Sequence, residues 1–189
     1  MENTVWQKVS KQNNVNHLIS TCLLIHKQHD SIMESEYTEA LKKAAHYCSK
    51  QERCKADIYK KLQDWNISEE LHDDIIQELE SEQFIDEKRY AQFFTKEKFK
   101  FNRWGKGKIR YALYQKGIPP EYTETGLKHI DAEQYEETLW ELLEKKDESL
   151  QEEDMMKRKS KLIRYASGKG YEQDIVYNLV DKILEQNKK

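Results

Sequence analysis

Proline and glycine are scarce in this sequence, with 2 prolines and 6 glycines in 189 residues. Because both residues interrupt helices, their scarcity favours long regular helices. Long apolar runs are also absent, since the longest, residues 22–25, is far too short to span a bilayer. Residues 1–10 lack the basic-then-apolar pattern of a secretion signal. We therefore expect a soluble, cytoplasmic helical protein without a membrane partner.

Cysteine and net charge are low as well. Cys22, Cys48 and Cys54 form an odd set without close paired spacing, which predicts free thiols in a reducing compartment. The formal net charge of −3 gives no global basic signature of nucleic-acid binding. Mean hydropathy is only −1.01, but aromatic residues make up 11% of the chain. Disordered chains are usually poor in aromatic residues, so a folded protein with large solvated faces is expected.

An apolar pattern recurs about every fifty residues. Ile67, Ile118 and Tyr171 are equivalent positions, separated by 51 and 53 residues. One residue before them stand Asn66, Gly117 and Gly170, which are residue types that tolerate the left-handed conformation closing a helix. Five further columns align at fixed distances from this point, with Gly126 and Ala166 as their weakest members: Ile58/Ile109/Leu162, Leu62/Leu113/Ala166, Leu71/Tyr122/Ile175, Ile75/Gly126/Leu179 and Leu79/Ile130/Ile183.

Each copy reads as three helices. In the first copy, apolar residues three and four apart predict helices over 36–50, 54–65 and 68–82. The second copy opens with a helix over 86–103, and the third opens at a cap formed by Asp131 and Gln134, followed by a polar linker over 145–154. A period of this length predicts an all-α fold in which three tandem three-helix repeats stack into an elongated, curved array.

The expected units are an N-terminal extension, residues 1–35, and repeats over 36–83, 84–131 and 132–189. The extension is polar, carries only a short apolar patch around Leu18 and Leu23, and is expected to be partly disordered. Met33 precedes the first periodic helix, and one hypothesis is that translation starts there; the intact mass of the natively expressed protein distinguishes the two starts.

Residues that suggest catalysis or metal binding occur without the pattern that such chemistry needs. The stretch Gly105-Lys106-Gly107-Lys108 lacks the spacing of a phosphate-binding loop and the strand that precedes one, so it reads as a helix boundary. Cys22, His26 and His29 share a spacing suited to zinc, but no fourth ligand is evident. We expect no enzymatic activity, no cofactor or metal, and no small-molecule substrate.

Two basic segments are the candidate contact sites. In the first, aromatic residues alternate with cations, a composition typical of surfaces that meet phosphates or dock on a partner. The alternative is that the aromatic residues form the core and the lysines solvate helix ends; Phe94, Trp104 and Leu113 are expected in the core. The candidate residues are Lys98, Lys100, Arg103, Lys106, Lys108 and Arg110 in the first segment and Lys157, Arg158, Lys159, Lys161 and Arg164 in the second.

A basic stripe along one face of the array follows from the repeat register. Lys55, Lys106 and Lys159 occupy the same position of successive repeats. The aromatic residues interleaved with the first basic segment are Phe99, Phe101, Trp104, Tyr111 and Tyr114.

The order of three motifs resembles the RecX family of recombination regulators. The motifs are Phe84-Ile85-Asp86-Glu87-Lys88-Arg89-Tyr90-Ala91, then Trp104-Gly105-Lys106-Gly107-Lys108-Ile109-Arg110 with Leu113, Lys116, Gly117 and Ile118, and finally Leu162, Arg164, Tyr165, Gly168, Gly170, Tyr171 and Ile175. The resemblance covers about residues 37–185. It implies three three-helix repeats, no enzymatic activity, and binding to the RecA recombinase in its DNA-bound filament.

The same resemblance implies that the protein lies along the filament groove and damps ATP hydrolysis and strand exchange. DNA is then a partner as part of the filament. Binding to DNA alone is expected to be weak, because each phosphate contact needs a cation and the chain has a net charge of −3. A stand-alone nucleic-acid-binding helical repeat is the alternative, supported by the basic and aromatic segment over 96–116.

Overall fold

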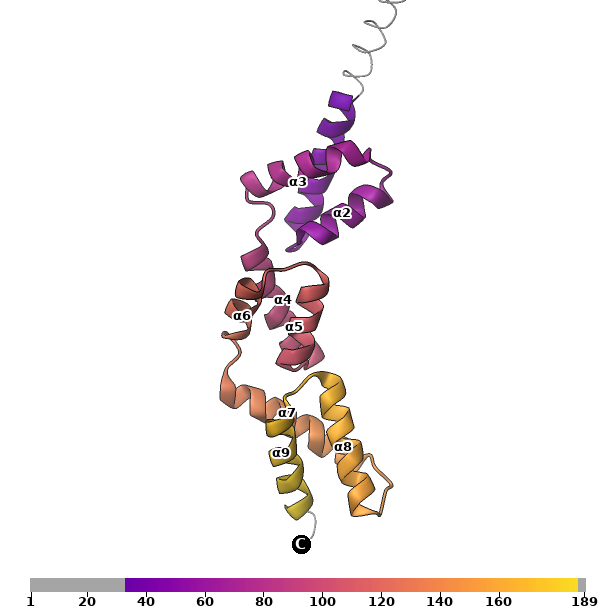
Figure 1. Cartoon of the computed structure of the whole chain (residues 1–189), viewed down its shortest axis with the longest axis vertical. Coiled ribbons are helices and arrows are strands. Elements are labelled where there is room, and N and C mark those ends of the chain that lie inside the picture. Colours follow the sequence, from indigo (N-terminus) through magenta and orange to yellow (C-terminus); the bar gives the residue numbers. More distant parts are fainter. Residues whose placement is uncertain (1–32, 187–189) are drawn as a thin grey trace, which may run out of the picture.

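The computed structural model describes residues 33–186, and the helices of this part form three consecutive groups. The first group consists of a helix over residues 33–50, α2 (Lys55–Asp64), a 3-10 turn η1 (Glu69–Leu71) and α3 (His72–Ser81). The second group is α4 (Glu87–Asn102), α5 (Lys106–Gln115) and α6 (Pro120–Leu127), and the third is α7 (Ala132–Glu148), α8 (Met155–Lys169) and α9 (Gln173–Gln186). The groups follow one another in an elongated array (Figure 1). Since the described part contains no strand, the predicted all-α fold of three tandem three-helix repeats is confirmed.

The ends of the helices follow from local chemistry. The side chains of Asp86 and Asp131 each accept a hydrogen bond from a backbone N–H three residues later, which satisfies a donor that the helix itself leaves unpaired. Pro120 occupies the first turn of α6, where its missing N–H is not needed. At the other helix ends, Asn66, Gly117 and Gly170 have φ values of 56°, 74° and 90°. The left-handed column predicted from the repeat is therefore present in all three copies.

The aligned apolar columns form the core. Ile58, Ile109 and Leu162 are fully buried, and the next column, Leu62, Leu113 and Ala166, is fully buried too. The first repeat has its own apolar cluster, whereas the second and third share one continuous cluster. Neighbouring repeats also exchange residues, because Ile85 packs into the first cluster and Cys54 into the second. A repeat therefore depends on its neighbour for part of its burial.

Two local predictions need correction. The segment over 145–154 was expected to be a linker, but α7 continues to Glu148. The reason is that the helix end is anchored: Leu143 and Asp147 are buried, and Asp147 Oδ1 lies 2.5 Å from Arg158 Nε. The helix expected over 68–82 begins instead with the 3-10 turn η1.

The predictions for residues 1–32 lie outside the described residues. This covers nearly all of the predicted N-terminal extension, including Cys22, His26 and His29. Within the described part, no helix is both long and apolar enough to cross a membrane. The predicted limits of the repeats fall between α3 and α4 and between α6 and α7; as domain limits they stay a prediction.

Backbone atoms make the contact between the second and third repeats. The N–H of Gly105 donates to the carbonyl of Lys169 at 2.9 Å, and the N–H of Gly107 donates to the carbonyl of Gly170 at 3.0 Å. A Cβ on Gly105 would lie 2.3 Å from the Gly170 carbonyl carbon, so no other residue fits there without a shift of the backbone. The two glycines therefore serve as a contact between repeats, at the start of α5.

The first and second repeats meet through the equivalent helix ends, with side chains in place of glycines. Lys116 Nζ lies 2.6 Å from Asp57 Oδ1, which joins the end of α5 to the start of α2. At both junctions, the start of a middle helix meets the end of the next middle helix. The three middle helices α2, α5 and α8 consequently succeed one another along one edge of the array (Figure 1).

Candidate partner-binding surface

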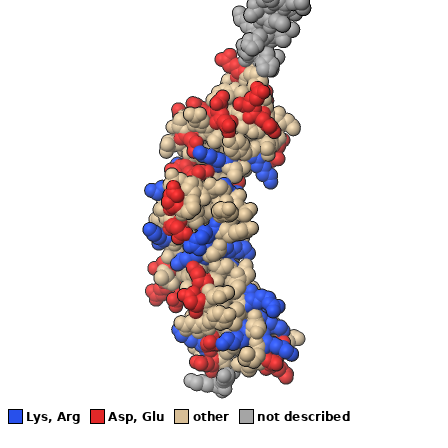
Figure 2. All heavy atoms as spheres, viewed as in Figure 1, with Lys and Arg blue, Asp and Glu red and all other residues tan. Residues whose placement is uncertain are grey.

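The middle helices of the second and third repeats carry a strong excess of positive charge. Neither α5 nor α8 contains an acidic residue. In contrast, α3, a third helix of a repeat, has acidic residues and no lysine or arginine. Figure 2 shows lysine and arginine gathered over α8, and acidic residues gathered over the first repeat at the other end. We call the cations of α5 and α8 the basic edge: Lys106, Lys108, Arg110, Lys157, Arg158, Lys159, Lys161, Arg164 and Lys169.

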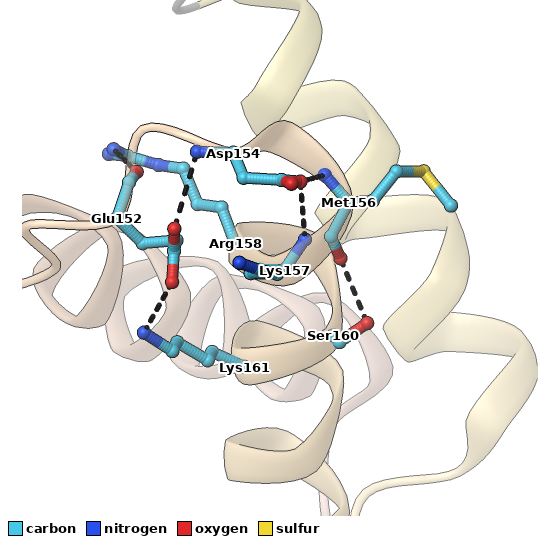
Figure 3. Close-up of polar contacts among 7 residues, drawn as sticks. All are labelled: Glu152, Asp154, Met156, Lys157, Arg158, Ser160 and Lys161. Atoms are coloured by element: carbon cyan, nitrogen blue, oxygen red, sulfur yellow. Dashed lines mark hydrogen bonds and ion pairs between the residues drawn. The ribbon is translucent and has the colours of Figure 1, made fainter.

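The first turn of α8 is held by a compact set of polar contacts (Figure 3). Asp154 Oδ1 accepts from the backbone N–H groups of Met156 and Lys157 at 2.9 and 3.1 Å, which caps the helix. Arg158 donates to Asp147 Oδ1 at 2.5 Å and to the carbonyl of Glu152 at 3.3 Å. Since Asp147 is buried, the Arg158 guanidinium anchors the connection between α7 and α8. Arg158, a predicted contact residue, thus uses its guanidinium for hydrogen bonds within the protein.

The lysines of the repeat column, Lys55, Lys106 and Lys159, are partly exposed and contact groups of the protein itself. Lys55 Nζ lies 2.7 Å from Glu80 Oε1, and Lys159 forms an ion pair with Asp181. Both partners belong to the third helix of the same repeat. Lys106 Nζ rests 4.6 Å from the centre of the Tyr135 ring. All three lysines therefore make contacts within the protein. Fewer cations of the basic edge are free to meet a partner than the sequence predicts.

Two cations of α8 stay available to a partner. Lys157 and Arg164 are exposed, and their charged groups have no ion-pair partner within the described residues. Lys161 is also exposed but pairs with Glu152 at 2.9 Å. Exposed pairs of this kind are worth little, so Lys161 can be recruited by a competing anion.

At the start of α5, Trp104 lies under two ammonium groups. Lys108 Nζ is 4.9 Å and Lys98 Nζ is 5.9 Å from its ring centre. Lys98 Nζ also lies 2.8 Å from Glu97 Oε1, and Lys108 Nζ donates to the Gly168 carbonyl at 3.3 Å. Trp104 is half-buried, whereas Phe94 and Leu113 are buried, as expected of core residues.

The aromatic residues of the first basic segment divide into two groups. Phe99 is buried in the core. Phe101, Tyr111 and Tyr114 are exposed by 73%, 65% and 71%, values that leave their rings open to a partner. Only these three fit the predicted role of exposed aromatic contacts.

The eleven predicted cations do not form a single patch. Lys100 and Arg103 lie on the side of α4 away from Lys98 and Trp104, where they line a groove between α4 and α7. Arg110 faces α6 and holds both oxygens of Glu124, at 2.7 and 3.3 Å. This hydrogen-bonded pairing raises the pKa of Arg110 and lowers the pKa of Glu124.

The described thiols are poorly placed for chemistry. Burial raises the pKa of Cys48 to about 11, and burial together with the carboxylate of Asp57 raises the pKa of Cys54 to about 11. The thiolate is the reactive form, so both are inert near neutral pH. No group of three histidine, cysteine or acidic residues in the described part is arranged to hold a metal ion.

Sequence reasoning missed the groove between α4 and α7. Its signal was nonetheless present, because Arg89, Lys96, Lys100 and Arg103 follow one another at intervals of seven, four and three residues. Such intervals place side chains in one row on a helix. What the sequence did not reveal is which helix forms the facing wall.

Comparisons with known proteins agree with this geometry. Residues 86–127 match the family described as "RecX, second three-helix domain", and residues 133–180 match "RecX, third three-helix domain". A protein named "Regulatory protein RecX" from Clostridium acetobutylicum is 31% identical over 162 residues, which cover 84% of this chain and 75% of that relative.

Two solved structures are similar to the fold. The first, "Crystal structure of regulatory protein RecX", has a TM-score of 0.71 and 26% identity, covering 78% of this chain and 73% of that one. The second, "Crystal structure of RecX from Lactobacillus salivarius", has a TM-score of 0.68 and 22% identity, covering 79% of this chain and 97% of that one.

Proposed function

Because this chain belongs to the RecX family of regulatory proteins, we propose that it binds the RecA recombinase in its DNA-bound filament. Bound there, it lowers ATP hydrolysis and strand exchange without performing chemistry of its own. The site of action is the cytoplasm, where the filament forms on DNA. Its partners are RecA and, as part of the filament, DNA.

The observation that carries this proposal is the basic edge on an elongated, braced array. A filament is a repeating surface that includes DNA phosphates, and a row of cations on a long body suits such a target. The second and third repeats share one apolar cluster and are joined by backbone hydrogen bonds, which supports their acting as one arm. The net charge of −3 disfavours tight binding to DNA alone.

The direct test is ATP hydrolysis by RecA from the same organism on single-stranded DNA, with this protein titrated in. We expect a dose-dependent fall in the rate that added free DNA does not relieve. An unchanged rate, together with tight and salt-sensitive binding to DNA alone, would contradict the proposal.

A stand-alone nucleic-acid-binding role is the second candidate, favoured by the exposed rings of Phe101, Tyr111 and Tyr114. Bases stack on such rings, each contributing roughly 1–3 kcal/mol. Binding to labelled single-stranded DNA over a series of salt concentrations, with and without RecA, separates the two roles. Affinity that RecA does not increase would favour this second role.

A further inference from the structure

A groove of about 910 Å³ runs between α4 and α7, next to the end of α6. Four cations line it in one row, namely Arg89, Lys96 and Lys100 on α4 and Arg103 directly after the helix. At a rise of 1.5 Å per residue this row is roughly 21 Å long. The row matches about six residues of an extended peptide, since a strand rises roughly 3.4 Å per residue.

Part of this positive charge is not neutralised within the protein. Lys96 and Lys100 are exposed and have no carboxylate partner among the residues that the structure describes. Arg103 pairs with Glu141 at 2.9 Å, but the two side chains are 44% and 52% exposed, so a ligand can compete for this pair. Arg89 is held more firmly, by Glu52 at 2.7 Å. The wall therefore offers two free ammonium groups and one exchangeable guanidinium.

The middle of the groove is apolar and its floor is already formed. Phe93, exposed by 40%, lies within the row of cations, and Phe99 and Ile130 contribute buried apolar surface. At the floor, Gly126 packs so closely on α4 that a Cβ there would lie 2.9 Å from the carbonyl oxygen of Ala91. A groove that combines some apolar surface with charged groups suits a ligand that carries both.

The wall of the groove that α7 forms distinguishes between a nucleic acid and a polypeptide as the ligand. On α7 the groove is lined by Glu137 and Glu141, both exposed. A nucleic-acid strand is negatively charged throughout and would place phosphates against these carboxylates. A polypeptide can instead direct acidic side chains to α4 and neutral or basic groups to α7.

We propose that this groove binds an acidic peptide segment of a protein partner. Its carboxylates contact Lys96, Lys100 and Arg103, and one of its apolar side chains rests on Phe93. The groove lies on the flank of α4 opposite the one where Lys98 covers Trp104. It is thus a second contact surface, and the proposal does not depend on RecA binding through the basic edge.

Fluorescence anisotropy with a fluorescein-labelled peptide of about ten residues, glutamates around two central phenylalanines, tests the proposal on the full chain. We expect the parent protein to bind it and Lys96→Glu/Lys100→Glu to weaken binding about tenfold or more. Glu137→Lys/Glu141→Lys should tighten binding, because it removes two repelling carboxylates and frees Arg103. The matched control, Lys60→Glu/Lys182→Glu at exposed positions on α2 and α9, makes the same change in charge and should leave the affinity within about twofold.

Three outcomes would overturn the proposal. They are no binding by the parent protein, an equal loss in both charge-reversed variants, and tighter binding of oligothymidine than of the peptide through Lys96 and Lys100. The last outcome would make the groove a nucleic-acid site. Because the assay contains no RecA, its result is independent of the ATP hydrolysis test. The exchanged side chains are exposed, and circular dichroism verifies that each variant keeps its helices.

Discussion

Tyr135 links the third repeat to the second and also contacts residues at the start of α9 within its own repeat. Its hydroxyl accepts from the backbone N–H of Lys106 at 2.8 Å and donates to Glu172 at 2.6 Å. Its ring lies 4.9 Å from that of Tyr171, centre to centre. Burial and the Glu172 hydrogen bond raise the pKa of Tyr135, so the phenol stays protonated and can donate.

Replacing this hydroxyl therefore tests the junction. We expect Tyr135→Phe to lower the free energy of unfolding by about 1–3 kcal/mol, because it leaves a part-buried N–H and a part-buried carboxylate without this partner. Urea denaturation followed by circular dichroism measures the change. Tyr114→Phe, at a ring exposed by 71%, is the control and should have an effect within about 0.5 kcal/mol. Equal stability of the Tyr135→Phe variant and the parent would refute this role.

The ion pair of Asp57 with Lys116 should make the junction between the first and second repeats depend on pH. Burial tends to raise the pKa of the Asp57 carboxyl group, but the hydrogen bond and charge of Lys116 and the hydrogen bonds from Cys54 outweigh burial, so the pKa is lowered from 3.8. A carboxyl group with a lower pKa in the folded state stabilises the fold above its unfolded pKa, and the stabilisation is lost as pH falls through the folded value.

We therefore expect the parent protein to lose more unfolding free energy than Asp57→Asn when the pH falls from near neutral to below about 3.8. Urea denaturation of both proteins across this range gives the comparison. Parallel curves for the two proteins would show that Asp57 does not stabilise the junction in this way.

For single residues, the sequence predicted backbone conformation better than it predicted the partners of charged side chains. The left-handed conformation of Asn66, Gly117 and Gly170 follows from residue type and repeat register. The ion pairs of Lys55 and Lys159 do not, because their partners lie on helices whose rotation is set by packing of the whole repeat. The repeated position therefore predicted partly exposed lysines, but not that Lys55 and Lys159 would each pair with a carboxylate of their own repeat.

Among the elements, the start of α5 leaves no room for a side chain at Gly105. Gly105 faces the Gly170 carbonyl so closely that an added Cβ would lie 2.3 Å from it, whereas a Cβ on Gly168, in α8, would meet nothing within 4 Å. These two glycines form a matched pair for testing the junction between the repeats.

We expect Gly105→Ala to force the second and third repeats apart, lowering the unfolding free energy and changing the small-angle X-ray scattering profile. Gly168→Ala should instead raise stability by about 0.5–1 kcal/mol, because alanine loses less conformational freedom in a helix. An unchanged scattering profile and stability for Gly105→Ala would contradict the close backbone contact.

Most helices were predictable because their apolar residues recur three and four apart. The extension of α7 to Glu148 was not, since that stretch is polar and is anchored by the ion pair of the buried Asp147 with Arg158. The groove between α4 and α7 was missed for a related reason. The row of cations on α4 is visible in the sequence, but the opposing Glu137 and Glu141 reach it only through the arrangement of helices.

For the whole molecule, the arrangement of charge matters more than the net value of −3. Cations collect on α5 and α8 along one edge, and acidic residues collect on the first repeat (Figure 2). The sequence predicted a basic stripe, and the geometry divides it into a basic edge, in which Arg110 is paired with Glu124, and a groove on the other side of α4. The limits of the three repeats as domains stay a prediction.

Binding of charge-reversed variants to RecA filaments tests the central claim most directly. The variant Lys157→Glu/Arg164→Glu alters two exposed cations of the basic edge that form no ion pair within the described residues. The variant Lys128→Glu/Lys182→Glu makes the same change in charge at exposed positions at the end of α6 and on α9. Co-sedimentation with filaments formed on single-stranded DNA measures both affinities. We predict that the first variant binds about tenfold more weakly than the parent and that the second stays within about twofold. Equal affinities for the parent and the first variant, with both proteins folded, would contradict filament binding through the basic edge.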